Sequence, residues 1–189
     1  MATLTLALYN TYGVKRFHDA HLRAIARAAP LAYAYGFHLA LVGFPLEGKP
    51  SEVAEAVAEK TTIGEGGKYL IELALSNRFH LLDFPRRGFP PQFGTPVATT
   101  RKPSDEKEIT PLQLAEAFVG GESFLLLVGL GRHGLPKETF KLARYHMDVT
   151  GRRVSLETCT AMGAIVAEIS TYVGALKWGS GRRTLRGFW

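Results

Sequence analysis

Short, strongly apolar segments recur along this chain, and a stretch with helical periodicity separates each from the next. FHLALVG (37–43) and FLLLV (124–128) have the length and composition of single buried strands. Strands that alternate with helices in this way form a mostly parallel sheet with helices on both faces. The order of the segments therefore predicts an α/β fold.

The segments can be assigned from periodicity and from their flanking residues. The predicted strands are Thr3–Leu8, Phe37–Gly43, Phe79–Phe84, Pro96–Thr100, Phe124–Val128 and Tyr145–Val149. The predicted helices are His18–Tyr35, Ser51–Lys60, Lys68–Ser76, Thr110–Phe118, Leu135–Ala143 and Ser155–Leu176. Pro30 is expected to kink the first helix or end it early, with Gly36 as the final stop. No repeat or boundary divides the chain, so a single domain is expected over residues 1–189.

The chain has a net charge of +6 and a single cysteine, Cys159, and the cysteine bears on where in the cell the protein is expected. A lone cysteine cannot form an internal disulfide, which favours a cytoplasmic location. The N-terminus lacks a charged region followed by a long apolar core, so no signal peptide is expected. The longest unbroken apolar runs are too short to cross a bilayer, so no membrane partner is expected.

Basic residues gather near the N-terminus, in the loop-rich middle and in the tail 179–189, where aromatic residues are interleaved with arginines. Such an excess favours anionic partners, nucleic acid first. Basic and aromatic groups together suit phosphates and unstacked bases, although a frayed, solvated terminus is the alternative for the tail. The residues expected to bind nucleic acid are Lys15, Arg16, Arg23, Arg182, Arg183 and Arg186.

A glycine-rich turn, GLGRHG, follows the most apolar strand and satisfies G-x-G-x-x-G at Gly129, Gly131 and Gly134. With Asp148 further along, this pattern is also found in dinucleotide-binding folds. Only about 40 residues follow Asp148, too few for the second half of such a fold, and the helix after Gly134 has only about two turns. An NAD-dependent oxidoreductase therefore stays a remote alternative.

Four motifs, in this order, resemble those of the SPOUT (α/β-knot) methyltransferases, as a divergent branch. The first is AHLRAIARAAPLAYAYGFHLALVG, with Arg27 at the place of the family's arginine. PVATTRKP resembles the strand that ends in a Thr-Thr turn. LLLVGLGRHGLPKE resembles the second motif, and VSLETCTAMGAIVAEI resembles the third.

The resemblance implies an enzyme that transfers a methyl group from S-adenosylmethionine to tRNA or rRNA. It also implies a homodimer with active sites shared between subunits, and a trefoil knot over about residues 95–178. Whether a ribose 2′-oxygen or a base nitrogen is methylated stays open, and no metal is expected. The residues that would bind the cofactor are Thr99, Thr100, Gly129, Leu130, Gly131, Gly134, Leu135, Pro136, Val154, Ser155, Leu156 and Thr158.

The expected catalytic residues are Arg27, His21 and Glu157. Arg27 would bind an acceptor phosphate, since a guanidinium is a poor base. His21 is either a proton acceptor or a histidine on the helix surface, and Glu157 either takes part in chemistry or caps a helix. The chain departs from the family at Gly131, where an acid is usual, and at Glu157, where an asparagine is usual. These changes favour the alternative of an RNA-binding protein that keeps the knotted fold without turnover.

Overall fold

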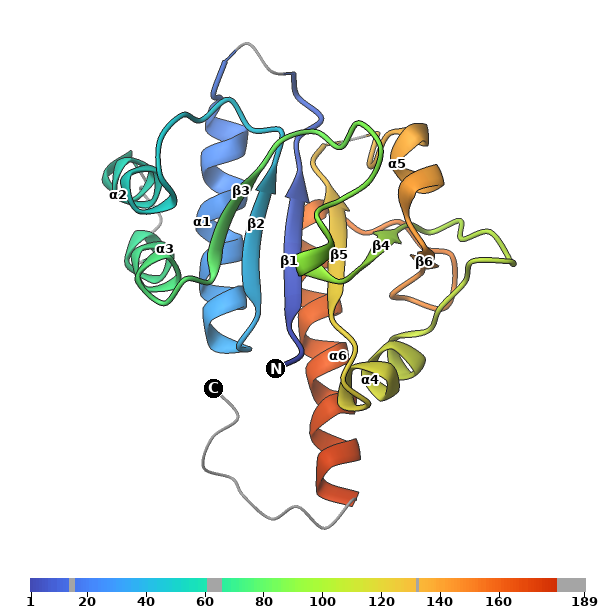
Figure 1. Ribbon diagram of the computed structural model, residues 1–189. Helices are drawn as coiled ribbons and strands as arrows, with labels where there is room; N and C mark the ends of the chain where they lie inside the picture. The colour runs from blue at the N-terminus through green and yellow to red at the C-terminus, as the bar shows by residue number, and fades with distance from the viewer. Residues whose placement is uncertain (14–15, 61–65, 132, 180–189) are drawn as a thin grey trace.

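The computed structural model describes residues 1–13, 16–60, 66–131 and 133–179. Its strands form one six-stranded sheet in the order β3-β2-β1-β5-β4-β6, and every neighbouring pair is parallel (Figure 1). The strands are β1 (Leu4–Tyr9), β2 (His38–Val42), β3 (Phe79–Leu82), β4 (Thr95–Thr99), β5 (Phe124–Gly129) and β6 (Tyr145–Met147). The predicted α/β fold with a parallel sheet is confirmed.

In the described residues, five α-helices and one short 3₁₀-helix connect these strands, and a sixth α-helix follows β6. They are α1 (Asp19–Ala34), α2 (Pro50–Lys60), α3 (Gly66–Leu75), η1 (Pro91–Phe93), α4 (Pro111–Val119), α5 (Lys137–Leu142) and α6 (Thr158–Gly179). Each observed α-helix lies within two residues or so of the segment that the sequence predicts. The agreement follows from strong apolar periodicity and from clear stop signals, such as Gly36, which has a φ of +70°.

Pro30 is the exception, because it lies inside α1 and does not end it. Proline removes one backbone hydrogen bond and normally breaks a helix interior. Here the buried side of α1, which includes Ile25, Ala28, Ala29 and Ala32, packs on the sheet and holds the helix together beyond that position. The expectation of an early end was therefore wrong, because tertiary packing outweighs the local cost.

The two faces of the sheet are covered differently. Helices α1, α2, α3, α4 and α6 pack on one face, against β-strand residues such as Leu6, Leu39 and Leu126. The other face is covered by α5 and by the loop between β3 and β4, through Phe93, Leu135 and Ala143 (Figure 1). Both faces are thus buried, which explains why the central strands are apolar along their whole length.

The strand order brings the carboxyl ends of β5, β4 and β6 next to one another. Three loops leave the sheet there, namely 130–136 after β5, 100–110 after β4 and 148–157 after β6. Ligands of parallel sheets bind at this edge. The expected trefoil knot over residues 95–178 and the single domain stay predictions, because strand order does not trace how the chain is threaded.

Helix α6 is 22 residues long and, by length and composition alone, could cross a membrane. The sequence reading missed this property because it considered only unbroken apolar runs. Only 28% of the most apolar window of α6 is buried within the chain. One side packs in the core through Met162, Ile165, Val166, Ile169 and Val173, and much of the other side presents small residues. A helix in the core of a soluble protein can pass the same test, so the absence of a membrane partner stays a prediction.

Candidate active site

A large cleft of about 1170 Å³ lies among the three loops at the carboxyl ends of β5, β4 and β6. The loops supply both polar and apolar groups, and the start of α6 closes one side through residues such as Thr158, Ala161 and Ile165. The volume is somewhat larger than the range for pockets that hold drug-sized ligands, about 300–1,000 Å³. The cleft can therefore hold a ligand as large as a nucleoside cofactor.

The glycines of the 130–136 loop and of the strand end before it are required by local geometry. A Cβ on Gly129 would lie 2.4 Å from the carbonyl carbon of Gly134, so the loop could not fold back on the strand. Gly131 and Gly134 have φ values of +77° and +64°, which side-chain-bearing residues rarely adopt. Backbone atoms therefore form much of this wall, and a ligand can approach them closely.

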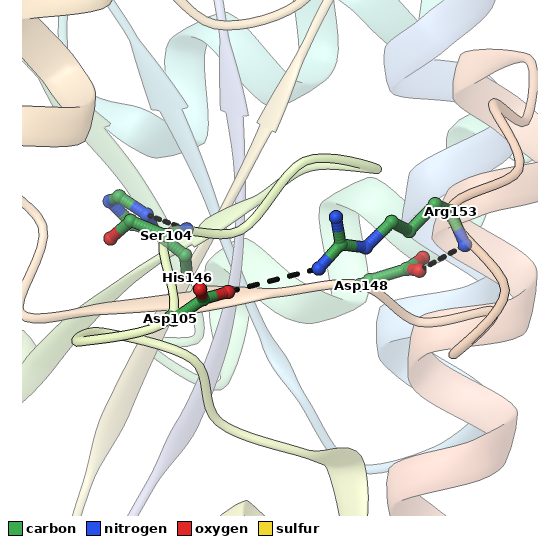
Figure 2. Close-up of polar contacts among 5 residues, drawn as sticks. All are labelled: Ser104, Asp105, His146, Asp148 and Arg153. Carbon is green, nitrogen blue, oxygen red and sulfur yellow. Dashed lines mark hydrogen bonds and ion pairs between the residues drawn. The ribbon is translucent and has the colours of Figure 1, made fainter.

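Asp148 shapes the loop after β6. Its carboxylate is buried and accepts hydrogen bonds from the backbone N–H and the hydroxyl of Thr150, at 3.0 and 2.8 Å. It also accepts from the N–H of Arg153, at 2.6 Å (Figure 2). This occupied carboxylate closes a tight turn. It does not act as the ribose-binding acid that a dinucleotide fold would place here.

The loop after β4 and helix α5 are joined to the sheet through His146 of β6. Its Nδ1 accepts from the N–H of Ser104 at 3.2 Å (Figure 2), so Nε2 carries the proton and donates to the carbonyl of Phe140 at 3.0 Å. Lys107 Nζ donates to three carbonyls at the end of α5, with the shortest distance, 2.9 Å, to Ala143. Arg153 and Asp105 form an exposed ion pair at 3.8 Å. The loop after β4 is therefore joined to β6, to the end of α5 and to the loop after β6.

Ten of the twelve residues expected to bind the cofactor line this cleft. They are Thr99, Thr100, Gly129, Gly131, Gly134, Leu135, Val154, Ser155, Leu156 and Thr158. Leu130 instead points into the core, with 1% of its surface exposed, and Pro136 caps the start of α5 outside the cleft lining. Sequence reasoning missed Tyr12, Arg101 and Lys102, which also line the cleft. The position of these residues after strands could have identified them, since Tyr12 follows a strand that pairs with β5.

A small cavity of about 130 Å³ adjoins the cleft and shares Tyr12, Gly131, Glu157 and Thr158 with it. Helix α1 contributes Arg23 and Arg27, which are exposed and one turn apart. The guanidinium of Arg27 donates to Cys159 Sγ at 3.3 Å, and this contact raises the pKa of Arg27. Arg27 is therefore held beside the cleft of its own chain.

His21 is fully buried and does not lie on the helix surface. Its Nδ1 accepts from the N–H of His18 at 2.9 Å, so Nε2 carries the proton and lies 2.8 Å from Asn10 Oδ1. Burial, and secondarily the nearby His18, lowers the pKa of His21. The ring is thus neutral, and neither nitrogen has a free lone pair, so this arrangement positions the end of β1 and offers no proton acceptor.

Glu157 lies directly before the first residue of α6 and is exposed. Its carboxylate accepts from the N–H groups of Cys159, at 2.9 Å, and Thr160, at 3.3 Å. These are the backbone donors that a helix leaves unpaired in its first turn. Of the two roles open for Glu157, the geometry supports the cap.

The residues expected to bind nucleic acid are only partly described. Arg16 and Arg23 are exposed, on the segment before α1 and on α1 itself. Lys15, Arg182, Arg183 and Arg186 lie outside the described residues. Among the residues that are described, no cluster of three or more histidines, cysteines or acids could hold a metal ion.

One family model and one curated relative match almost the whole chain. The model of the family described as "Protein of unknown function (DUF531)" matches residues 4–170. "Uncharacterized protein MJ0224" of Methanocaldococcus jannaschii is 49% identical over 169 residues, which cover 89% of this chain and 94% of that protein.

Solved structures of low identity share the fold. A probable methylase family protein from Haemophilus influenzae matches with a TM-score of 0.60 at 16% identity, over 97% of this chain and 71% of that one. The TrmH/SpoU tRNA modifying enzyme of A. aeolicus matches with a TM-score of 0.52 at 15% identity, over 96% and 78%. The SpoU methyltransferase AviRb of Streptomyces viridochromogenes, in complex with AdoMet, matches with a TM-score of 0.50 at 16% identity, over 88% and 56%. The chain belongs to the DUF531 family, and it is a divergent member of the SPOUT fold.

Proposed function

We propose that this protein is an S-adenosylmethionine-dependent methyltransferase that acts on tRNA or rRNA. The observation that carries the proposal is the cleft of about 1170 Å³ among the loops after β5, β4 and β6, lined by ten of the residues expected to bind the cofactor. Solved proteins of the same fold include a methyltransferase in complex with AdoMet and a tRNA modifying enzyme.

The residues of the cleft fit S-adenosylmethionine by their chemistry. The glycine loop offers backbone groups that can hydrogen-bond a purine and a ribose without side chains in the way, and Leu135 and Leu156 supply apolar surface. When bound, the cofactor supplies an activated methyl group on a sulfonium, so the protein has to align an acceptor and exclude water. Arg27 would bind a phosphate of the acceptor RNA.

We also propose a cytoplasmic homodimer that uses the uncovered side of α6. This side carries small residues, including Gly163, Ala164 and Ala167, and ends at the exposed Trp178. Small residues let two helices approach closely, and a partly uncovered apolar helix gains stability when a second copy covers it.

A second candidate is an RNA-binding protein that keeps the fold without turnover. It is favoured because both ring nitrogens of His21 are used structurally and because Glu157 caps α6 through its Oε2. Transfer of radiolabelled methyl groups from S-adenosylmethionine to total RNA separates the two candidates. Cofactor binding without transfer would favour the second, and mass spectrometry of RNA nucleosides would identify the methylated position.

The cofactor assignment is tested by Gly134→Val. The φ of +64° at Gly134 disfavours a β-branched residue, while a Cβ there meets no atom within 4 Å, so the strain stays in the loop. We expect S-adenosylmethionine affinity to fall by about 5- to 150-fold in calorimetry, since about 1–3 kcal/mol of strain distorts the binding loop.

Gly121→Val is the matched control. Gly121 has a φ of +109° and equally open surroundings, but it lies in the turn before β5, at the opposite edge of the sheet. It should leave cofactor affinity unchanged. An unchanged affinity in Gly134→Val, or tighter binding of NAD than of S-adenosylmethionine to the wild-type protein, would refute the assignment.

A further inference from the structure

Tyr12 lies on the boundary between the large cleft and the small cavity and lines both. It follows β1, and 46% of its surface is exposed. An exposed aromatic ring beside a cleft is available to a ligand, because it offers a large apolar face together with a polar hydroxyl. The roles proposed for the cofactor-binding residues and for Arg27 do not explain why the Tyr12 ring lies at this position.

The position of Tyr12 is fixed from several sides. Its backbone N–H donates to Asn10 Oδ1 at 2.9 Å, and Asn10 is buried. The ring meets that of His21 edge-on, with 5.6 Å between centroids and 81° between planes. It also lies so close to Gly131 that a Cβ there would be 2.9 Å from Tyr12 Cε1. The ring is therefore held in place before any ligand binds.

The small cavity beside this ring has a positive side. Arg23 and Arg27 line it from α1, and the contact with Cys159 Sγ at 3.3 Å orients Arg27. Glu157 is the single carboxylate among the lining residues, and its Oε2 accepts hydrogen bonds from the first turn of α6. With about 130 Å³, the cavity is too small for a second nucleoside cofactor, but it opens beside the cleft where that cofactor would lie.

We propose that Tyr12 stacks on the base of an unpaired nucleotide of the acceptor RNA, while Arg23 and Arg27 of the same chain contact its phosphates. The inference rests on the proposed function and deepens it, since it makes the substrate a single-stranded or splayed-out nucleotide. Aromatic rings bind unstacked bases, which a duplex does not offer, and arginines bind phosphates in a bidentate way. The base would thereby be held at the edge of the cofactor cleft.

Photocrosslinking of the wild-type protein tests this contact directly. The probe is a 12-nucleotide single-stranded oligouridylate that carries 5-iodouridine, whose photoproducts form chiefly with aromatic rings in stacking contact. We expect the crosslinked peptide to contain Tyr12, and we expect the same strand in a duplex to give no such product. Crosslinks confined to peptides that lack Tyr12 would overturn the proposal.

Variants give a second, quantitative test with the same oligonucleotide. Tyr12→Leu should weaken binding by about 5- to 150-fold, the range for loss of one stacked base, and Tyr12→Phe should restore most of the affinity. Tyr33→Leu is the matched control, because Tyr33 on α1 is similarly exposed, at 38%, and lines neither cavity. Wild-type affinity in Tyr12→Leu would overturn the proposal.

Calorimetry with S-adenosylmethionine on the same proteins keeps the two proposals distinguishable. If the wild-type protein binds no S-adenosylmethionine, the proposed function fails, while the crosslink still decides whether Tyr12 meets RNA. If Tyr12→Leu does not fold, the crosslink in the wild-type protein decides as well.

Discussion

Asn10 is the residue that joins three parts of the molecule at the end of β1. Its Oδ1 accepts from the N–H of Tyr12, at 2.9 Å, and lies 2.8 Å from His21 Nε2, while its Nδ2 donates to the carbonyls of Gly13 and Gly43, at 2.9 and 2.8 Å. A buried amide is stable only when its hydrogen bonds are satisfied. Asn10 meets this condition, and in doing so it fixes the loop that carries Tyr12.

A second polar contact, between the partly buried side chains of His38 and His80, predicts how stability depends on pH. His38 Nδ1 lies 3.0 Å from His80 Nε2, and burial, followed by the charges of His80 and Arg78, lowers the pKa of His38 to about 4. Between about pH 6.5 and 4, His38 is therefore protonated in the unfolded chain, where the pKa of histidine is about 6.5, but not in the folded chain. This contribution to stability is fully present above pH 6.5 and is lost as the pH falls to about 4.

The full shift corresponds to about 3 kcal/mol, and contact of the ring with solvent reduces the expected loss to roughly 1–2 kcal/mol. Urea unfolding of the wild-type protein and of His38→Gln at pH 7.5, 5.5 and 4.5 measures it. Because glutamine does not titrate, the stability difference between the two proteins should shrink towards low pH. A difference that is constant with pH would refute this role of His38.

At the scale of elements, variants at the N-cap of α6 distinguish a structural role of Glu157 from a chemical role. Glu157→Ala removes the acceptor for the N–H groups of Cys159 and Thr160. Loss of an N-cap costs about 1 kcal/mol, so the melting temperature should fall by about 2–4 °C for a chain of this length. Thermal unfolding followed by circular dichroism measures the change.

Glu157→Ser is the informative comparison, because serine caps helices well but can neither carry charge nor transfer a proton in the same way. If Glu157 is only a cap, this variant should recover the melting temperature and keep methyl transfer within a few-fold of wild type. A stable Glu157→Ser protein without transfer would instead assign Glu157 to the chemistry.

The helices and strands were largely predictable, because the signals that define them lie in neighbouring residues of the sequence. Apolar periodicity and flanking signals, such as the Thr110–Pro111 start of α4, are contained in neighbouring residues. The continuation of α1 past Pro30 was not predictable, because it depends on packing against strands far away in the sequence. The loop lining was also predictable, since residues that follow adjacent parallel strands meet at one edge.

At the scale of the whole molecule, the placement of Arg27 determines how two subunits would share a site. The family resemblance implies an arginine contributed by the partner subunit, whereas Arg27 here lines the small cavity beside its own cleft, in contact with Cys159. We therefore expect each active site to belong to one chain. Mixing Arg27→Ala chains with Gly134→Val chains should then restore no methyl transfer, because every site keeps one defect.

Mixed dimers for this test are isolated with two different affinity tags, so that their presence is confirmed before transfer is measured. Recovery of about half of the wild-type activity would contradict the expectation, since only a shared site leaves one of the two sites intact. Arg27→Ala alone should lower turnover by about 10²–10³-fold, the cost of one lost charged contact in the transition state, and leave cofactor affinity nearly unchanged.

By itself, the sequence determined the parallel α/β fold and the approximate limits of its elements, because these depend on neighbouring residues and on the order of the segments. Ten of the residues that line the cleft were implied by the family resemblance. Only the tertiary structure showed what surrounds His21, Glu157 and Tyr12. Whether a polar side chain is free for chemistry depends on which distant atoms meet it, as Asn10 meets His21 and Gly131 meets Tyr12. Such contacts leave no local pattern in the sequence, since they are set by packing between segments that the chain brings together only on folding.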